Sequence, residues 1–269
     1  MVPHSPMGWQ IKQFWTRCGS PVPSGVGSGR KRLLPALEGQ TILVTGAARG
    51  LGAAIARHLH GVGARLILLD RDEEGLADIG AACPGATSAV VDLADATATE
   101  RTIAEVVTGP VDTLIHNAAI LRVESLEAVG LDTFQATLNV GIQAAFQLTK
   151  AVWSGMKERG GALVFVSSRS GVEGFAGETA YCAGKHALEG FSKCLALEGV
   201  SHGILSVTIT PGMYMHTPMS ETTYPPELQE KWVDPILLAP AFSYLATRPM
   251  QLSGQRLNAW DLSQEQPAP

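Results

Sequence analysis

The chain has 269 residues and a formal net charge of -5, and 45% of its residues are hydrophobic while 17% are charged. This composition is typical of a globular protein with a sizeable core; it excludes a disordered chain and gives no reason to expect nucleic-acid binding. No run of 18 apolar residues occurs, so we expect no membrane-spanning helix.

The first 36 residues differ from the rest of the chain. They carry five lysines and arginines and no acidic residue, and Pro21–Gly29 is rich in Pro, Gly and Ser. We interpret residues 1–36 as a flexible basic extension that precedes a single domain over residues 37–269. An apolar stripe from Met7 to Cys18 leaves an organelle-targeting or membrane-surface role as the alternative. The four cysteines lack metal-type spacing and indicate free thiols in a reducing compartment, the cytoplasm.

Short apolar runs alternate with longer amphipathic segments from Thr41 onward. The runs are apolar throughout rather than alternating, which is typical of parallel strands that are covered on both faces. The longest predicted helices are Leu131–Lys157 and Thr179–Val200. Repeated alternation of strand and helix predicts a doubly wound α/β sheet. The predicted strands are Thr41–Thr45, Arg65–Leu69, Thr87–Val91, Thr113–His116, Ala162–Val166, Leu205–Thr210 and Arg256–Ala259.

The first predicted strand runs into a glycine-rich turn, Thr45–Gly52, with the sequence TGAARGLG, and a helix follows. Glycines here permit a tight turn, a close approach of the backbone to a pyrophosphate, and close packing of helix on strand. The phosphates would then lie at the positive N-terminus of the helix. The spacing G-x-x-x-G-x-G differs from the general dinucleotide fingerprint, so an ordinary tight turn remains the alternative.

The second predicted strand ends at Asp70. A carboxylate there can accept hydrogen bonds from an adenosine ribose and repels a 2′-phosphate, which favours NAD over NADP. Arg49 and Arg71 favour a phosphate instead, but we expect the repulsion at Asp70 to outweigh two solvated arginines. Asp92, after the third strand, lies where adenine would bind. For both acids a helix N-cap is the alternative role.

Two polar residues lie in apolar surroundings further along the chain. His116 ends the fourth strand, and we interpret it as a packed or capped histidine rather than a catalyst. Asn139 lies within the long helix next to Leu138 and Val140 and needs hydrogen-bond partners if it is buried. Its plain interpretation is a satisfied structural amide.

The strongest candidate for chemistry follows the fifth strand. Ser168 comes directly after this strand, and Tyr181 lies at the start of the next predicted helix. Lys185 follows Tyr181 by four residues, so the two side chains share one helix face. A phenol beside a cation, with a serine hydroxyl in reach, forms a proton-transfer site for an alcohol or a carbonyl.

Together these segments resemble the short-chain dehydrogenase/reductase family in its single-domain form. The resemblance covers roughly residues 37 to 262, and it implies a Rossmann-type parallel sheet of seven strands in the order 3-2-1-4-5-6-7, with helices on both faces and a nicotinamide cofactor. The matching segments are, in chain order, Thr45–Gly52, Asp70, Asp92, Asn117–Ala119, Asn139, Ser168, Tyr181-Cys-Ala-Gly-Lys185 and Pro211-Gly212.

The resemblance also implies roles. Tyr181 would be the general acid in reduction and the base in oxidation, with its pKa lowered from about 10 by Lys185 and by the positive nicotinamide. Lys185 would hold the nicotinamide ribose, Ser168 the reacting oxygen, and Asn139 a water that connects Lys185 to solvent. The implied cofactor contacts are Gly46, Arg49, Gly50, Leu51, Gly52, Asp70, Arg71, Asp92, Leu93, Asn117, Ala118, Tyr181, Lys185, Pro211, Gly212 and Thr217.

Three segments depart from the family pattern. Ala119 stands where glycine is usual in the family, and its methyl group is expected to narrow the binding site at this point. Thr217 follows Pro211-Gly212 one residue later than is common, which weakens its assignment as the partner of the nicotinamide carboxamide. The usual Gly-Gly after the last strand is missing from Leu252–Asp261, so contacts that depend on that turn are in question.

The substrate is expected at the carboxyl ends of the strands, between Ile120–Val123, Arg169–Phe175 and Met213–Trp232. The last segment is rich in methionine and aromatic residues, which predicts an apolar pocket. Arg169 could hold an acidic substrate, although a solvated arginine is the plainer interpretation. We therefore predict an NAD(P)-dependent oxidoreductase that interconverts a secondary alcohol and a ketone, uses NAD rather than NADP, and needs no metal.

The two long helices resemble the pair that forms a four-helix interface in the family, which implies a homodimer or a homotetramer. The predicted partners are otherwise a small-molecule substrate, and neither nucleic acid nor membrane. Two other classes are weighed. A catalytically silent cofactor-binding regulator would need a gap among Asn139, Ser168, Tyr181 and Lys185, and none is visible. A sugar-nucleotide epimerase would need a larger C-terminal substrate domain.

Overall fold

The computed structural model describes residues 36–224 and 226–265, which belong to one compact unit. The extension predicted over residues 1–36 lies outside this part of the chain, apart from Ala36, so its character stays a prediction. Within the described residues no helix is both long enough and apolar enough to cross a membrane.

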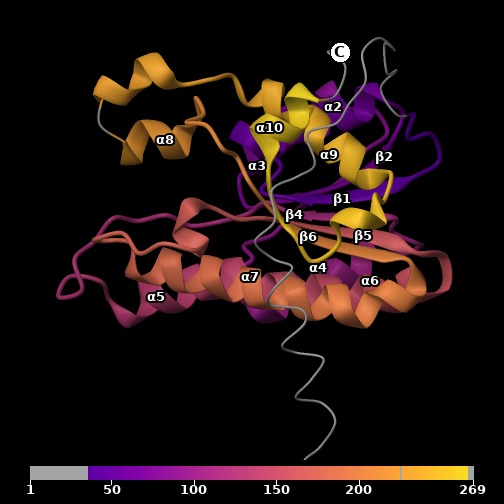
Figure 1. The fold of residues 1–269 in the computed structure, drawn as a ribbon, viewed down its shortest axis with the longest axis horizontal. Helices are drawn as coiled ribbons and strands as arrows, with labels where there is room; N and C mark the ends of the chain where they lie inside the picture. Colours follow the sequence, from indigo (N-terminus) through magenta and orange to yellow (C-terminus); the bar gives the residue numbers. More distant parts are fainter. Residues whose placement is uncertain (1–35, 225, 266–269) are drawn as a thin grey trace, which may run out of the picture. The chain divides into compact units, whose positions relative to one another are not determined.

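The core of the fold is a seven-stranded parallel sheet with the order β3-β2-β1-β4-β5-β6-β7 (Figure 1). The predicted topology is confirmed, and each strand agrees with its predicted bounds to within one residue. The strands are β1 (Thr41–Thr45), β2 (Arg65–Asp70), β3 (Thr87–Val90), β4 (Thr113–His116), β5 (Gly161–Val166), β6 (Ile204–Thr210) and β7 (Arg256–Asn258).

Helices cover both faces of the sheet, because successive residues of a buried strand point to opposite sides. Ile42 and Val44 of β1 pack into one apolar cluster with α2, α3 and α9, whereas Leu43 packs into the other with α4, α6 and α7. The helices are α2 (Gly50–Gly61), α3 (Glu73–Ala82), α4 (Ala96–Val106), α5 (Leu131–Leu138), α6 (Ala144–Arg159), α7 (Thr179–Gly199), α8 (Pro218–Thr223), α9 (Ala239–Ala246) and α10 (Ala259–Gln264).

The predicted helix Leu131–Lys157 is observed as one helical run over residues 131–159, but it contains a π-helical turn that the sequence did not predict. A π-helical turn, η1 (Asn139–Gln143), separates α5 from α6, and the backbone N–H of Ala144 donates to the carbonyl of Asn139, five residues earlier. The wider turn follows from partners outside the helix, since His116 binds two of its carbonyls. Single π-turns of this kind often mark functional sites.

Candidate active site

A cavity of about 460 Å³ opens at the carboxyl ends of the strands, where ligands bind in open α/β sheets. It extends from Asp70 and Arg71, after β2, to Tyr181 and Lys185 on α7. The structure therefore brings the predicted cofactor contacts together. Those that line the cavity are Gly46, Arg49, Gly50, Leu51, Asp70, Arg71, Asp92, Leu93, Asn117, Ala118, Tyr181, Lys185, Pro211 and Thr217; Gly52 and Gly212 do not.

Gly52 does not line the cavity, but it packs against the glycine loop. A Cβ atom added to Gly52 would overlap the carbonyl oxygen of Gly46, and it would lie 2.8 Å from the Nδ2 atom of Asn117. Gly46 itself has a φ of +64°, which favours glycine. The Nδ2 atom of Asn117 donates to the Gly46 carbonyl at 3.0 Å. The loop is thus held between the first turn of α2 and the end of β4.

Thr45 is a site residue that the sequence analysis did not single out. Its Oγ1 accepts the backbone N–H groups of Asn117 and Ala118 at 3.1 and 3.2 Å, and it donates to Nδ1 of His116 at 3.0 Å. A hydroxyl at a strand end, directly before a glycine loop, is the signal that could have pointed to it. Through Thr45 the ends of β1 and β4 act as one support for the cavity.

His116 is fully buried and acts as a packed histidine, as predicted. Its Nε2 donates to the carbonyls of Val140 and Gly141 at 3.0 and 2.9 Å, so its Nδ1 is the acceptor of the Thr45 hydroxyl. Burial lowers the pKa of His116 to about 4, and the charge of Lys185 contributes in the same direction. The ring therefore stays neutral and connects β4 to the π-helical turn.

The depressed pKa of His116 predicts an acid-sensitive fold. Between pH 6.5 and 4 the unfolded chain takes up a proton that folded His116 does not, so stability falls as pH drops through this window, by roughly 3 kcal/mol in total. We expect the melting temperature of the wild-type protein to fall more steeply below pH 6.5 than that of His116→Asn. The exposed His202 supplies the control His202→Asn, which should follow the wild type. Parallel wild-type and His116→Asn profiles would contradict this account.

Asn139 is partly buried, and its Nδ2 donates to the carbonyl of Ala94 at 2.9 Å. This agrees with a satisfied structural amide. Asn139 does not line the cavity, although it begins the π-helical turn whose Val140 does. Its implied part in a proton relay remains a prediction.

At the end of the cavity that follows β2, Asp70 is held by the backbone. Its two carboxylate oxygens accept the N–H groups of Ala48 at 2.9 Å and Asp72 at 3.0 Å. Asp70 is not the N-cap of α3, because Asp72 caps that helix through the N–H of Gly75. The N-cap alternative for Asp70 is therefore wrong, since the cap lies two residues later.

The acid after the third strand is likewise not a helix cap. Asp92 accepts the N–H of Ala94 at 2.9 Å in a local turn, and Asp95 caps α4. Both arginines near this end have acidic neighbours: Arg49 lies 3.5 Å from Asp72, and Arg71 lies 3.8 Å from Asp92. These exposed pairs offset part of the positive charge at the mouth of the cavity.

Lys185 and Tyr181 share one face of α7, as their spacing predicted. The Nζ atom of Lys185 lies 5.4 Å from the centre of the Tyr181 ring and donates to the Val166 carbonyl at 2.6 Å. Lys185 is 3% exposed, and this burial lowers its pKa to about 8, while the charge of Glu189 acts in the opposite direction.

The phenol of Tyr181 does not have the lowered pKa that the resemblance implied. Burial raises its pKa in the protein alone, and the charges of Tyr224 and Glu178 act in the same direction. A hydrogen bond with Ser168 opposes them. In the protein alone, burial therefore outweighs the groups that lower this pKa.

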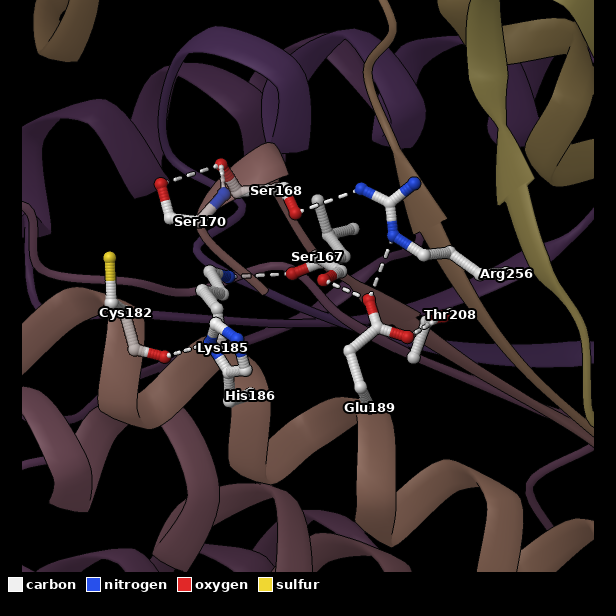
Figure 2. Close-up of polar contacts among 10 residues, drawn as sticks. Ser167, Ser168, Ser170, Cys182, Lys185, His186, Glu189, Thr208 and Arg256 are labelled. Carbon is white, nitrogen blue, oxygen red and sulfur yellow. Dashed lines mark hydrogen bonds and ion pairs between the residues drawn. The ribbon is translucent and has the colours of Figure 1, made fainter. Parts of the chain in front are cut away.

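Ser168 lies beside the phenol but does not line the cavity. It caps the short 3-10 turn η2 (Arg169–Gly171), with its Oγ accepting the N–H of Ser170 at 3.2 Å. Figure 2 shows this segment next to a second polar group that the sequence analysis missed, Glu189 with Arg256. Glu189 follows Lys185 by four residues on α7, a spacing that could have drawn attention to it.

The substrate side of the cavity agrees only in part with the predicted walls. Ile120, Leu121 and Arg122 line it, as do Met215 and Met219. The predicted wall Arg169–Phe175 contributes no lining residue. Instead, Arg169 forms an exposed ion pair with Glu173 at 2.8 Å and lies over the ring of Phe175 at 5.2 Å. The solvated interpretation of Arg169 is therefore confirmed.

The end of the sheet shows how the chain replaces the missing Gly-Gly turn. Asn258 ends β7 and caps α10 by accepting the N–H of Asp261 at 3.3 Å. A Cβ atom at Gly212 would overlap the Asn258 side chain, so only glycine leaves room for Asn258 at this point. The backbone N–H of Trp260 donates to the Pro211 carbonyl at 3.1 Å and fixes the segment that leads to Thr217.

The described residues contain no group of His, Cys, Asp and Glu side chains that could hold a metal ion. The polar groups at the cavity are a phenol, an ammonium, hydroxyls, two carboxylates, guanidinium groups, an amide and backbone groups. This set can bind a nucleotide and transfer a proton.

Comparison with known proteins places these motifs in a family. Residues 40–227 match the model of the family described as short chain dehydrogenase. L-xylulose reductase of Mus musculus is 37% identical over 190 residues, which cover 70% of this chain and 77% of that protein. The 3-oxoacyl-[acyl-carrier-protein] reductase FabG of Vibrio harveyi is 37% identical over 69% of this chain and 77% of its own.

Solved structures of similar proteins have the same fold. A protein from Beutenbergia cavernae, assigned as an NAD(P)-dependent gluconate 5-dehydrogenase with NADP bound at low occupancy, superposes with a TM-score of 0.76. It is 28% identical, and the match covers 84% of this chain and 98% of that one. A chain from Pseudomonas syringae, assigned as a short chain dehydrogenase, gives a TM-score of 0.74 at 33% identity, over 84% of this chain and 97% of its own.

Proposed function

The chain belongs to the short-chain dehydrogenase/reductase family, and from that membership we propose that Tyr181, Lys185, Ser168 and Asn139 carry out its reaction, the NAD(P)-dependent interconversion of an alcohol and a ketone. The observation that carries the proposal is that Tyr181 and Lys185 lie at one end of the same cavity whose other end holds Asp70. A proton-transfer pair and a nucleotide cradle thus share one space.

The residues of the cavity fit a nicotinamide dinucleotide. Gly46 and Gly50 have φ angles of +64° and +54°, so the loop backbone is open to a pyrophosphate at the N-terminus of α2. Asp70 would hold the adenosine ribose, and Lys185 would hold the nicotinamide ribose. The bound cofactor supplies or accepts the hydride.

The protein's own part is to handle the proton. In ketone reduction, the Oη atom of Tyr181 donates its proton to the carbonyl oxygen as charge develops there. The Ser168 hydroxyl donates a hydrogen bond to the same oxygen and stabilises that charge. Lys185, held by the Val166 carbonyl, keeps a positive charge 5.4 Å from the centre of the Tyr181 ring and so favours the phenolate that remains. Asn139, at the start of the π-helical turn, would hold the water that returns a proton from solvent.

NAD is the proposed cofactor. The carboxylate of Asp70 would repel a 2′-phosphate, while its oxygens keep lone pairs for a ribose diol in addition to the two backbone N–H groups that they already accept. The pairing of Arg49 with Asp72 and of Arg71 with Asp92 weakens the attraction of the arginines for a phosphate. The solved relative from Beutenbergia cavernae binds NADP, so wild-type preference has to be measured.

Asp70→Ser should shift cofactor preference toward NADPH. Serine removes the charge but keeps an oxygen that can accept the N–H of Ala48. The ratio of the NADPH and NADH dissociation constants, from fluorescence titration, should fall by about tenfold or more, since hydrogen bonds to a charged group contribute about 1.5–3 kcal/mol. Asp95→Ser, the same change at the cap of α4 outside the cavity, should leave the ratio unchanged. Tighter wild-type binding of NADPH than of NADH would overturn the assignment.

The proposed activity is tested by turnover on a panel with both cofactors. The panel includes three compounds that occur in the names of the relatives: L-xylulose and a 3-oxoacyl thioester, tested for reduction, and gluconate, tested for oxidation. It also includes aliphatic and aromatic ketones, which suit the side chains of Met215 and Met219. We expect reduction of at least one carbonyl compound. Saturable NADH or NADPH binding without turnover of any compound would support a cofactor-binding regulator instead.

A homodimer or homotetramer is proposed on the outer face of α5, α6 and α7. Phe146 and Leu197 are 51% and 62% exposed there, and the rings of Phe146 and Phe191 lie 6.4 Å apart. Light scattering of the purified protein measures the assembly directly.

Cys83, Cys182 and Cys194 are free thiols, which supports the proposed cytoplasmic location.

A further inference from the structure

The segment that carries the catalytic serine lies just beyond the sheet. The last residue of β5 is Val166, and the Ser167 N–H still donates to Ile209 of β6 at 2.8 Å. Ser168 follows with an extended backbone and begins the η2 turn. Because the ladder of strand hydrogen bonds ends here, other groups have to fix the backbone that orients the Ser168 side chain.

Glu189 is one of these groups. Its carboxylate is 6% exposed and accepts three donors: the Ser167 hydroxyl at 2.5 Å, the Thr208 hydroxyl at 2.7 Å and the Nε–H of Arg256 at 3.2 Å (Figure 2). A Cβ atom at Gly171 would lie 2.6 Å from the Ser167 hydroxyl and 3.1 Å from the carboxylate, so glycine leaves room for this contact. The carboxylate thus joins α7 to β5, β6 and β7.

Arg256 is the other group. Its Nη2 donates to the Ser168 carbonyl at 2.9 Å, while its Nε holds Glu189. The same carbonyl accepts the Gly171 N–H at 2.9 Å, which closes the η2 turn. A guanidinium presents several donors in a fixed plane and can make both contacts at once, which an ammonium on a flexible stem cannot.

We propose that Glu189 and Arg256 are positioning residues for the reaction assigned above. They fix the end of β5, which carries both Ser168 and the Val166 carbonyl that holds Lys185. Three successive residues are held by three side chains: the Val166 carbonyl by Lys185, the Ser167 hydroxyl by Glu189, and the Ser168 carbonyl by Arg256. The inference rests on the proposed roles of Ser168 and Lys185.

The charge of Glu189 also acts on Lys185, one helical turn away. The charged and titratable groups around the Lys185 ammonium are Tyr181 and Glu189 on α7 and neutral His116 at the end of β4. Glu189 is the group that raises the pKa of Lys185 against the effect of burial. Removing its charge should therefore make Lys185 lose its proton at a lower pH.

The first test uses steady-state NADH oxidation with the carbonyl compound that the wild-type protein reduces best in the panel above. Arg256→Met and Arg256→Lys should each lower kcat by about 10- to 100-fold, since misplacement of a catalytic group by 1 Å can cost about that much. The NADH dissociation constant should stay within about twofold, or about 0.4 kcal/mol, since Arg256 does not line the cavity. Arg101→Met, in an exposed ion pair with Glu105 on α4, is the matched control and should match the wild type.

The double variant Glu189→Leu/Arg256→Met distinguishes positioning from a purely structural role. Replacing both members of a buried ion pair with apolar residues often preserves folding, so its melting temperature should be close to that of the wild type while its kcat stays low. Wild-type kcat in this double variant would overturn the proposal. Glu189→Gln should shift the alkaline limit of kcat to lower pH, and an unchanged limit would count against it.

A second readout needs no substrate. Hydrogen exchange of the cofactor-free protein reports the Gly171 amide, which donates to the Ser168 carbonyl. It should exchange several-fold faster in Arg256→Met than in the wild type or in Arg101→Met, and equal rates would overturn the positioning role. If this exchange is faster but the wild type reduces no carbonyl compound, the proposed function fails and the fixing of the strand end stands.

Discussion

Tyr181→Phe is expected to lower kcat by roughly 10²- to 10⁴-fold, which is the contribution typical of a positioned general acid. The variant removes one oxygen atom, the proton donor to the reacting carbonyl, and leaves the aromatic ring in place. Because the ring fills the same space at the end of the cavity, the dissociation constant of NADH should change little. Steady-state rates and fluorescence titration measure the two effects separately.

The neighbouring residue offers a matched control for this prediction. Cys182 is a free thiol beside Tyr181 on α7 and does not line the cavity. Cys182→Ala should therefore retain wild-type kcat, which shows that small changes in this turn of the helix are tolerated. A Tyr181→Phe protein with wild-type turnover would eliminate Tyr181 as the acid.

The raised pKa of Tyr181 has different consequences in the two directions of the reaction. In reduction the phenol has to be protonated at the start, and burial keeps it so. In oxidation the phenol has to be ionised, which requires positive charge close by. Lys185 lies 5.4 Å from the ring centre, and the oxidised nicotinamide adds a second positive charge. We therefore expect oxidation to speed up with rising pH, while the rate of reduction does not fall through ionisation of Tyr181.

The strands and the Tyr181–Lys185 pair could be predicted from the sequence because each depends on a local pattern. Continuous apolar runs such as Thr41–Thr45 define buried parallel strands almost to the residue. The spacing of four residues places two side chains on one helix face whatever the rest of the fold does. Asp70 and the glycine loop follow strand ends, which meet at one edge of a parallel sheet.

The supports behind these residues could not be predicted, because they join positions far apart in the sequence. Glu189 and Arg256 are 67 positions apart, and their contact depends on the pairing of β6 with β7. The π-helical turn at Asn139 likewise depends on His116, which lies on β4. In both cases the local pattern favoured a plain helix or an ordinary surface charge, and a partner from another strand decided the outcome.

Gly52→Ala is expected to weaken binding of NADH by about 5- to 100-fold while leaving the sheet folded. A Cβ atom at Gly52 would overlap the carbonyl oxygen of Gly46, and that carbonyl also accepts Nδ2 of Asn117. Backbone cannot give way as the end of a flexible side chain can. Overpacking of this kind costs about 1–3 kcal/mol, and each 1.4 kcal/mol is a factor of about ten in affinity.

The effect of Gly52→Ala should appear in affinity rather than in fold, because the loop that moves lines the cavity and lies outside the strands. Gly61, at the other end of the same helix α2, is the matched control, since a Cβ atom there meets nothing within 4 Å. Gly61→Ala should bind NADH as the wild type does and melt at the same or a higher temperature. If Gly52→Ala bound NADH with wild-type affinity, the glycine loop would not be the pyrophosphate cradle, and the assignment of this end of the cavity would have to be abandoned.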